Sequence, residues 1–337
     1  MRSHAAERVS ITPVPGIGKP VMQDLVSTRD LSTAEVRSIL DLAAVVKARP
    51  ADFRKTLDGK QLVMFFEKPS LRTRLTFEAG MASLGGNAFF MDQTGGRIDA
   101  RESLHDIAHN VSRWVDVIVL RTFAHSTVEE MAMHASIPVI NALSDLEHPC
   151  QALADYSVLQ ERFGNLKDIT LAYVGDGNNV AHSLLLTGAL LGSNVRVATP
   201  KGYEPNDDIL SAAQDIALGT GATIEVLNDP YQAVGGADAV YTDAWASMGQ
   251  EHEAEARRAI FQPYQVNERL MAEAASHAIF MHCLPSHRGE EVTNAVMDSP
   301  QSVIFDQAEG RLHVQKAILM LLLWGGASRF PVRSAHA

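Results

Sequence analysis

Short runs of apolar and β-branched residues alternate with longer segments of helical periodicity through most of the chain. Such alternation is typical of βαβ units, whose strands lie parallel in a sheet covered by helices. The expected strands are Gln61–Phe66, Ala88–Met91, Asp116–Leu120, Pro138–Asn141, Ile169–Val174, Asn194–Ala198, Thr223–Val226, Ala239–Thr242, Ile279–His282 and Val303–Phe305. The clearest expected helices are Thr73–Leu84, Glu102–Trp114, Gln151–Phe163 and Val180–Leu191, with a last helix over about Ala308–Leu323. The pattern therefore predicts an α/β fold with parallel sheets.

The length of 337 residues exceeds the usual size of one domain, so two domains are expected. We place the break near His148–Gln151, because a long helix begins there after the fourth expected strand. The first domain then covers residues 1–148 and the second covers residues 149–310.

Near the amino end, Ser32-Thr33-Ala34-Glu35 has the spacing of a capping box and predicts a helix that continues to Val46.

Composition narrows the class of protein. The chain is 46% hydrophobic and 20% charged, as is ordinary for a globular protein. Its net charge of −11 argues against binding to nucleic acids or anionic membranes, which requires a positive surface. No segment has the roughly 18 to 20 uncharged apolar residues that a membrane-spanning helix needs. The first twenty or so residues lack the apolar region of a signal peptide and are expected to form a poorly ordered leader. Cys150 and Cys283 are too few for a disulfide scaffold, so a reduced, cytoplasmic protein is expected.

The segment Glu67–Arg74 directly follows an expected strand and opens a helix. Free N–H groups and the helix dipole favour an anion at such a point. Ser70 and Thr73 add hydroxyl donors, and Arg72 and Arg74 add guanidinium groups whose planar fork suits phosphate. The same residues also suit an N-capped helix with two surface arginines, so the local pattern leaves both interpretations open.

Two further helix starts carry polar side chains. His148-Pro149-Cys150-Gln151 opens the long helix after the fourth expected strand. A lone histidine is more often structural, but beside cations it can donate to a carbonyl oxygen. Gln151 offers an acceptor and two donors, which together recognise an NH2 group and its neighbouring oxygen. Arg311 stands near the start of the last helix, where a surface arginine is an equally good interpretation.

The loop Gly175-Asp176-Gly177-Asn178-Asn179 follows an expected strand and resembles a nucleotide-binding turn. The third glycine of that motif is missing, because Val180 stands in its place. We therefore favour a loop whose asparagine contacts a substrate. A dinucleotide-dependent oxidoreductase is kept as the rival enzyme class.

Two later segments also follow expected strands. In Asp243–Gly249, Asp243 can pair with an ammonium group, while Ser247 and neighbouring N–H groups can hold a carboxylate. The segment also suits a polar turn. In His282-Cys283-Leu284-Pro285, the thiol suggests a nucleophile. Adjacent strand residues point to opposite faces, however, so His282 is poorly placed as a base for Cys283. A cis bond before Pro285 is compatible with this run.

Together these segments resemble the aspartate/ornithine carbamoyltransferase family, in the family's order and over about Leu25 to Trp324. In the first half, the family's phosphate motif matches Ser70-Leu71-Arg72-Thr73-Arg74, its carbamoyl-site arginine matches Arg121, and its His-Pro-x-Gln motif matches His148–Gln151. In the second half, its ornithine-side asparagine matches Asn179, and its Asp-x-x-x-Ser-Met-Gly motif matches Asp243–Gly249. Its His-Cys-Leu-Pro motif matches His282–Pro285, and its late arginine matches Arg311.

The resemblance implies two parallel-sheet domains, with a C-terminal helix (residues 311–331) that returns to the first domain, in a homotrimer or a larger assembly of trimers. It implies transfer of the carbamoyl group of carbamoyl phosphate to the side-chain amine of L-ornithine, giving L-citrulline and phosphate without a cofactor or metal. The implied carbamoyl phosphate site is Ser70, Leu71, Arg72, Thr73, Arg74, Arg97, Arg121, His148, Gln151 and Arg311. The implied ornithine site is Asn179, Asp243, Ser247, Met248, Cys283 and Leu284, and the catalytic residues are Arg121, His148 and Cys283.

Two positions depart from the family pattern. Leu71 replaces a threonine, which removes a side-chain donor and leaves the backbone N–H. Arg97 stands where many relatives have a glutamine that reaches into a neighbouring subunit's site. Because the leucine also occurs in the N-acetylornithine branch, that branch is a rival, as is a putrescine carbamoyltransferase. The Asp243–Gly249 motif and His287 resemble the free-ornithine type, whereas the aspartate branch needs cations where Asp243 stands. A carbamoyltransferase-like scaffold without turnover is the non-catalytic rival.

Overall fold

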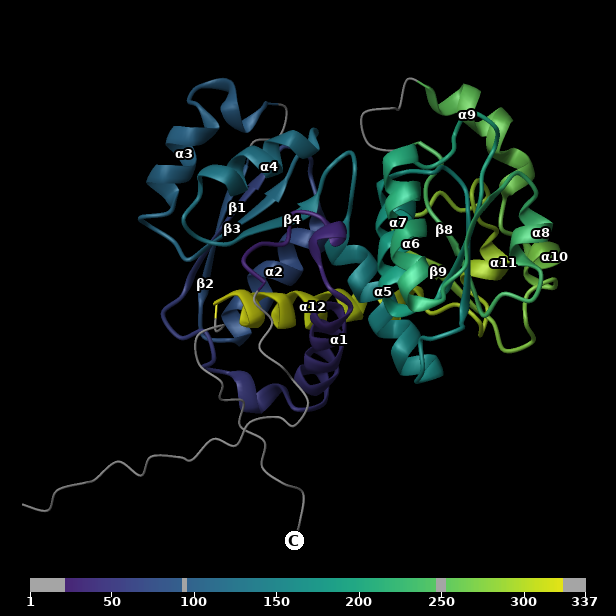
Figure 1. Cartoon of the computed structure of the whole chain (residues 1–337), viewed down its shortest axis with the longest axis horizontal. Coiled ribbons are helices and arrows are strands. Elements are labelled where there is room, and N and C mark those ends of the chain that lie inside the picture. Colours follow the sequence, from purple (N-terminus) through teal and green to yellow (C-terminus); the bar gives the residue numbers. More distant parts are fainter. Residues whose placement is uncertain (1–21, 93–95, 247–252, 324–337) are drawn as a thin grey trace, which may run out of the picture.

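The computed structural model describes residues 22–92, 96–246 and 253–323. It has two lobes side by side, each built around one parallel sheet (Figure 1). The first sheet has the strand order β2-β1-β3-β4, and the second has the order β7-β6-β5-β8-β9. The strands are β1 (Gln61–Phe66), β2 (Asn87–Asp92), β3 (Val117–Arg121), β4 (Val139–Leu143), β5 (Thr170–Val174), β6 (Asn194–Ala198), β7 (Ile224–Leu227), β8 (Ala239–Thr242) and β9 (Ile279–His282). The predicted two-domain α/β fold is confirmed.

Helices cover both faces of each sheet. They are α1 (Thr33–Ala48), α2 (Leu71–Ser83), α3 (Leu104–Val111), α4 (His125–His134), α5 (Pro149–Phe163), α6 (Asn179–Leu191), α7 (Asp207–Thr220), α8 (Pro230–Val234), α9 (Ala254–Phe261), α10 (Glu268–Met271), α11 (Asn294–Met297) and α12 (Ile304–Leu323). The predicted capping box of α1 is present: Ser32 Oγ accepts from Glu35 N, and Glu35 Oε2 accepts from Ser32 N at 2.7 Å.

Alternating side chains of the central strand β1 explain how the first sheet is covered. Leu62, Met64 and Phe66 pack into the core that contains α1, α2 and α12. Val63 and Phe65 point the other way, into a separate cluster with residues of α3 and α4. Both faces are therefore buried, which is why β1 is a continuous apolar run rather than an alternating one.

The C-terminal helix α12 joins the two lobes. It packs against α1 and α2 of the first lobe and against α5, where the second lobe begins (Figure 1). Val314, Ile318 and Leu319 are fully buried in this contact. The expected return of the last helix to the first domain is confirmed for its described part, which ends at Leu323. The remaining residues of the expected 311–331 segment lie outside the described part of the chain.

One expected strand is wrong. Val303–Phe305 is not a tenth strand, because α12 already begins at Ile304. Val303 N does donate to Phe280 O at 3.0 Å, but the chain then turns into the helix. Phe305 is 75% exposed on the first turn. Three consecutive apolar residues cannot by themselves distinguish a strand from the start of a helix.

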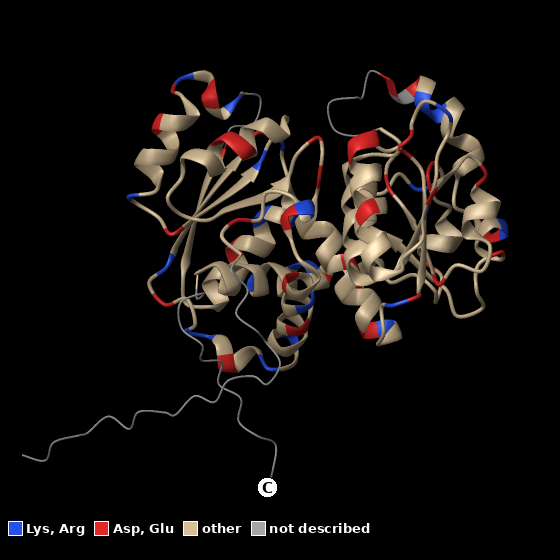
Figure 2. Ribbon diagram, in the orientation of Figure 1, with Lys and Arg blue, Asp and Glu red and all other residues tan. Residues whose placement is uncertain are grey.

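Charged residues are spread over the whole described structure. Figure 2 shows acidic and basic positions interspersed over both lobes. Within residues 22–92, 96–246 and 253–323, no helix combines the length and apolar character needed to cross a bilayer.

Candidate active site

A cavity of about 450 Å³ lies where the carboxyl ends of strands from both sheets meet. Ligands of open α/β sheets bind at such edges. Of the residues expected in the site, twelve line the cavity: Ser70, Leu71, Arg72, Thr73, Arg121, His148, Gln151, Asn179, Asp243, Cys283, Leu284 and Arg311. Segments far apart in sequence therefore converge on one space.

The start of α2 forms one wall of the cavity. Ser70 is the N-cap, and its Oγ accepts from Thr73 N at 3.2 Å. The Leu71 side chain is 76% exposed and follows the cap directly, so this position contributes its backbone rather than a polar side chain. The 13-residue helix directs its dipole and unpaired N–H groups towards the cavity, an arrangement that favours an anion.

Arg311 connects α12 to two other walls of the cavity. Its Nη2 donates to Thr73 Oγ1 at 2.7 Å, and its Nη1 donates to Gln151 Oε1 at 2.9 Å. Its Nε is buried without a hydrogen-bond partner. The side chain is only 3% exposed, and burial lowers its pKa. Arg311 therefore holds its neighbours in place and still has a donor to offer.

Arg121 is the last residue of β3 and is buried, with its Nε lacking a partner. Burial lowers the pKa of this guanidinium to about 9, and the nearby charges of Arg311 and Arg72 lower it further in the same direction. Positive charges that repel one another in a desolvated cavity are costly unless an anion joins them. The three arginines therefore favour a multiply charged anion at this point of the cavity.

His148 stands at the N-cap of α5, where its N–H donates to Ser183 Oγ at 2.9 Å. Burial holds the pKa of its imidazole well below the usual value, and Arg311 and Arg121 lower it too. The ring is therefore neutral at pH 7, and its Nδ1 is buried without a partner. A neutral imidazole beside two cations can donate one hydrogen bond to a carbonyl oxygen without adding charge.

The opposite wall belongs to the second sheet. Asp243 follows β8, and its carboxylate accepts from Asn178 Nδ2 at 2.9 Å and from Cys283 Sγ at 3.0 Å. Ala244 N donates to it as well, at 2.8 Å. All three donors are neutral, so the negative charge of Asp243 can pair with a ligand's ammonium group.

Cys283 is a thiol rather than a thiolate. Burial raises its pKa well above the usual value, and the charge of Asp243 raises it further. His282 does not act as its base, because His282 Nδ1 accepts from Leu284 N and Nε2 pairs with Glu291 Oε1 at 3.2 Å. The Leu284–Pro285 bond is cis, as the sequence suggested.

Asp243, His282 and Cys283 are close enough together to be considered as ligands of one metal ion. Ligand atoms of Asp243, His282 and Cys283 lie within 4.8 Å of one another. Both ring nitrogens of His282 are already engaged, and a raised thiol pKa opposes the thiolate that a metal binds. These three residues are therefore a poor metal site.

The glycine-rich loop has a packing explanation. A Cβ at Gly177 would lie 2.4 Å from Pro205 N, so only glycine fits against the neighbouring loop. Asn178 caps α6 through its Oδ1, and Asn179 Nδ2 donates to Ser144 O at 2.6 Å. The loop thus supports the cavity wall instead of enclosing a pyrophosphate.

Two expected site residues, Arg74 and Arg97, do not line the cavity, and two more lie outside the described part of the chain. Arg74 lies beside the cavity, paired with Glu78 at 2.9 Å and stacked 3.9 Å from the centre of the Phe90 ring. Arg97 is 66% exposed and pairs with Asp99 at 2.7 Å. Ser247 and Met248 lie outside the described residues, so their expected roles stay predictions.

Sequence reasoning did not assign roles to several residues of the site. Lys68 lines the cavity, with its Nζ 4.9 Å from the centre of the Phe123 ring, and His287 also lines it. Beneath the cavity, Asp155 Oδ1 accepts from Gln151 Nε2 at 2.8 Å, and its Oδ2 accepts from Tyr241 OH at 3.0 Å. Lys68 and His287 belong to the quoted motifs, whereas Asp155 carries no signal beyond being a helical acid.

Known proteins match the chain over nearly its full length. The family model described as the carbamoyl-P binding domain of aspartate/ornithine carbamoyltransferase matches residues 23–161, and the Asp/Orn binding domain matches residues 167–322. An ornithine carbamoyltransferase from Pyrococcus horikoshii is 50% identical over 310 residues, which is 91% of this chain and 98% of that protein. The chain belongs to the aspartate/ornithine carbamoyltransferase family. A second relative, an ornithine carbamoyltransferase from Symbiobacterium thermophilum, is 53% identical over 89% of this chain and 98% of that protein.

Solved structures of the aspartate/ornithine carbamoyltransferase family share the fold. Ornithine carbamoyltransferase from Pyrococcus furiosus superimposes with a TM-score of 0.87 at 48% identity, covering 94% of this chain and 100% of that one. An acetylornithine transcarbamylase complexed with acetylcitrulline gives a TM-score of 0.81 at 31% identity, covering 90% and 99%. The family resemblance seen in the sequence is confirmed.

Proposed function

We propose that this protein transfers the carbamoyl group of carbamoyl phosphate to the side-chain amine of L-ornithine, releasing phosphate and L-citrulline. The observation that carries the proposal is a cavity that has arginines on one wall and, on the other, the carboxylate of Asp243, for which the described residues provide neutral donors. One wall suits a dianion, and the other suits an α-ammonium group. The names of the relatives at about half identity agree with this pairing of substrates.

The phosphate group would lie at the start of α2. Arg72 and Arg121 supply charge, Ser70 and Thr73 supply hydroxyls, and Leu71 supplies its backbone N–H. Two negative charges that enter the cavity offset the repulsion between the arginines, which favours binding of a dianion over that of a neutral amide.

The carbonyl of the same substrate would lie deeper in the cavity. His148 and Arg121 would donate to its oxygen, and Gln151 Oε1 would accept from the carbamoyl NH2 with the lone pair that Arg311 leaves unused. Donors already in place cost no reorganisation when negative charge develops on that oxygen, so they stabilise the tetrahedral intermediate.

Ornithine would lie against the second domain. Asp243 would pair with its α-ammonium, and Asn179, Ser247 and Met248 would contribute to holding the α-amino and carboxylate groups. Its side-chain amine then reaches the carbonyl carbon past Cys283 and Leu284. The amine attacks in its neutral form, the C–O bond to phosphate breaks, and the departing phosphate can take the amine proton.

The test is a colorimetric assay of the ureido product with four acceptors side by side: ornithine, N-acetylornithine, putrescine and aspartate. We expect ornithine to be used best. N-acetylornithine has no α-ammonium for Asp243, and loss of one partner of a buried charge pair costs roughly 100-fold or more in kcat/KM. Faster turnover of N-acetylornithine or putrescine would assign the chain to that branch. No product with any acceptor would indicate a non-catalytic scaffold.

The domain division and assembly are part of the proposal. We place residues 1–148, with the C-terminal helix 311–331, in the carbamoyl phosphate domain and residues 149–310 in the ornithine domain. We further propose a cytoplasmic homotrimer or an assembly of trimers, in which Arg97 reaches a neighbouring subunit's site. Its exposure and its place outside its own cavity support that role. Light scattering after size-exclusion chromatography tests the assembly.

A further inference from the structure

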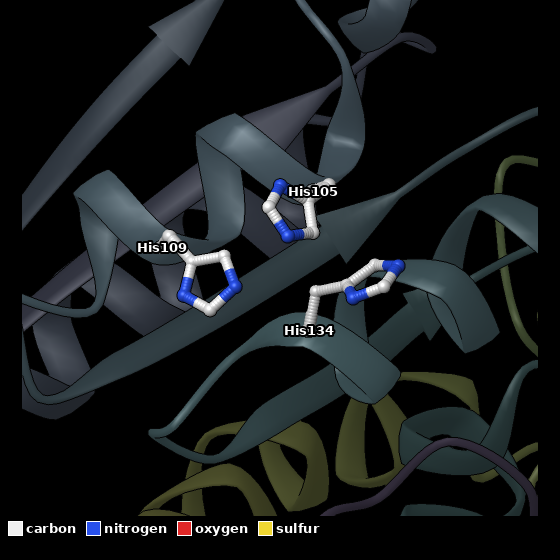
Figure 3. A group of neighbouring side chains, drawn as sticks. All are labelled: His105, His109 and His134. Carbon is white, nitrogen blue, oxygen red and sulfur yellow. The ribbon is translucent and has the colours of Figure 1, made fainter.

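Three histidines gather on the outer surface of the first domain, on α3 and α4. His105 and His109 are four residues apart on α3, and His134 is the last residue of α4. Figure 3 shows the three imidazole rings next to one another, two on one helix and the third on its neighbour. One ring nitrogen from each lies within 4.8 Å of those of the other two. None of them lines the substrate cavity.

We propose that His105, His109 and His134 form a surface site for a divalent late transition-metal ion such as Zn²⁺, Cu²⁺ or Co²⁺. Neutral imidazole is the nitrogen ligand that these ions prefer, and residues four apart on a helix present two ligands on one face. Three protein ligands leave the remaining position open to water.

The spacing of the rings suits one ion. A metal bound at about 2.1 Å lies about 3.2 Å from an imidazole centre, so tetrahedral coordination places ring centres about 5 Å apart. The observed separations are 4.4 Å between His105 and His109, 4.9 Å between His105 and His134, and 6.4 Å between His109 and His134. Only the rings of His109 and His134 have to move closer together, and rotation of side chains at the surface can supply that movement.

A neighbouring carboxylate prepares one ligand. Asp106 Oδ1 lies 3.0 Å from His105 Nδ1. A proton on Nδ1 directed at that carboxylate leaves the Nε2 lone pair for the metal, and such carboxylate–histidine pairs orient ligands in metal sites. The fold also fixes the helices, because Leu104, Ala108 and Val111 on the other face of α3 are buried against the sheet. The histidine face is thereby held towards solvent.

The measurement is metal binding by the full, tag-free chain at about pH 7.5, after treatment with a chelator. Isothermal titration with Zn²⁺ and absorbance with Co²⁺ are the readouts. We expect one high-affinity ion per chain, with Co²⁺ bands that lack thiolate-to-metal charge transfer. A metal held by Cys283 would produce such a charge-transfer band in the same titration. A spectrum without the band therefore distinguishes the histidine site from binding at Cys283.

His109→Ala and His134→Ala should each weaken Zn²⁺ binding at least about tenfold, since each removes one of three protein ligands. His277→Ala is the matched control, because it removes an exposed histidine that pairs with Asp238 in the second domain. Bound Zn²⁺ should raise the melting temperature of the wild type more than that of the two site variants, because it joins α3 to α4.

Two outcomes would overturn the site. One is Zn²⁺ affinity in His109→Ala and His134→Ala equal to that of the control. The other is wild-type affinity no tighter than on the order of 1 mM, which is what scattered surface histidines would give. Circular dichroism of each variant confirms that the comparison is made between folded proteins, and citrulline formation without added metal should be equal in all of them.

Discussion

Thr73 Oγ1 accepts a hydrogen bond of 2.7 Å from Arg311 Nη2, although the two residues are 238 positions apart. The bond joins the first turn of α2 to α12, and both partners are buried. The same guanidinium also holds Gln151. The phosphate end and the carbamoyl end of the proposed substrate site are therefore set by one side chain near the end of the chain.

Replacing Thr73 tests this connection. Thr73→Val leaves a buried guanidinium N–H without its acceptor, which costs about 1 to 3 kcal/mol. We expect a fall of roughly 5- to 150-fold in kcat/KM for carbamoyl phosphate. Thr73→Ser keeps the hydroxyl and should retain most of the activity. A serine variant as impaired as the valine variant would mean that the hydroxyl is not what matters.

Arg72→Ala tests the phosphate assignment. The substitution removes one of three converging cations, and we expect a loss of about 3 to 5 kcal/mol of transition-state stabilisation, measured as kcat/KM. Arg162→Ala is the matched control, because Arg162 pairs with Asp306 on the surface away from the cavity. Near wild-type turnover in Arg72→Ala would remove the phosphate role.

Cys283 should position ornithine rather than carry the carbamoyl group. Its raised pKa keeps the thiol protonated and hydrogen-bonded to Asp243. Cys283→Ala should raise KM for ornithine while turnover continues, and Cys283→Ser, which keeps a donor for Asp243, should be affected less. Complete loss of turnover, together with a carbamoylated Cys283 detected by mass spectrometry of the quenched wild type, would restore covalent catalysis.

Asp155 predicts a pH dependence of stability. Burial raises its pKa to about 7, whereas an aspartate in the unfolded chain titrates near 3.9. Between these values the folded protein holds a proton that the unfolded chain has released, so this group's contribution to stability falls as pH rises. Urea unfolding should show the advantage of the wild type over Asp155→Asn shrinking from about pH 4 to about pH 7. A constant difference would contradict the raised pKa.

The sequence was sufficient for most of the fold because buried parallel strands are continuous apolar runs. β1, β6, β8 and β9 have the predicted bounds, and the other five described strands differ by one or two residues at their ends. Val303–Phe305 was assigned wrongly. Val303 contacts Phe280 through one backbone hydrogen bond and the chain then enters α12, and local periodicity contains no information on that distant contact. Elements whose identity depends on such a distant partner are not accessible to pattern alone.

The site was predictable where polar residues end a strand, as Arg121 does, or directly follow one, as Asp243 and Cys283 do. Helix geometry could also have separated Arg72 from Arg74, because residues two apart on a helix do not share a face. In the structure Arg72 lines the cavity, whereas Arg74 stacks on Phe90. Asp155 was out of reach, since only the folded chain brings Tyr241 and Gln151 to the same carboxylate.

The position of α12 has a consequence for biosynthesis. A ribosome releases the strands of the first sheet long before it has made the helix that packs against α1 and α2. The nascent amino-terminal half therefore exposes an apolar surface until α12 has been made, and N-terminal domains that cannot close early are prone to aggregation. A nonsense mutation anywhere before Ile304 would remove both this cover and Arg311, so even a late truncation should yield an unstable polypeptide.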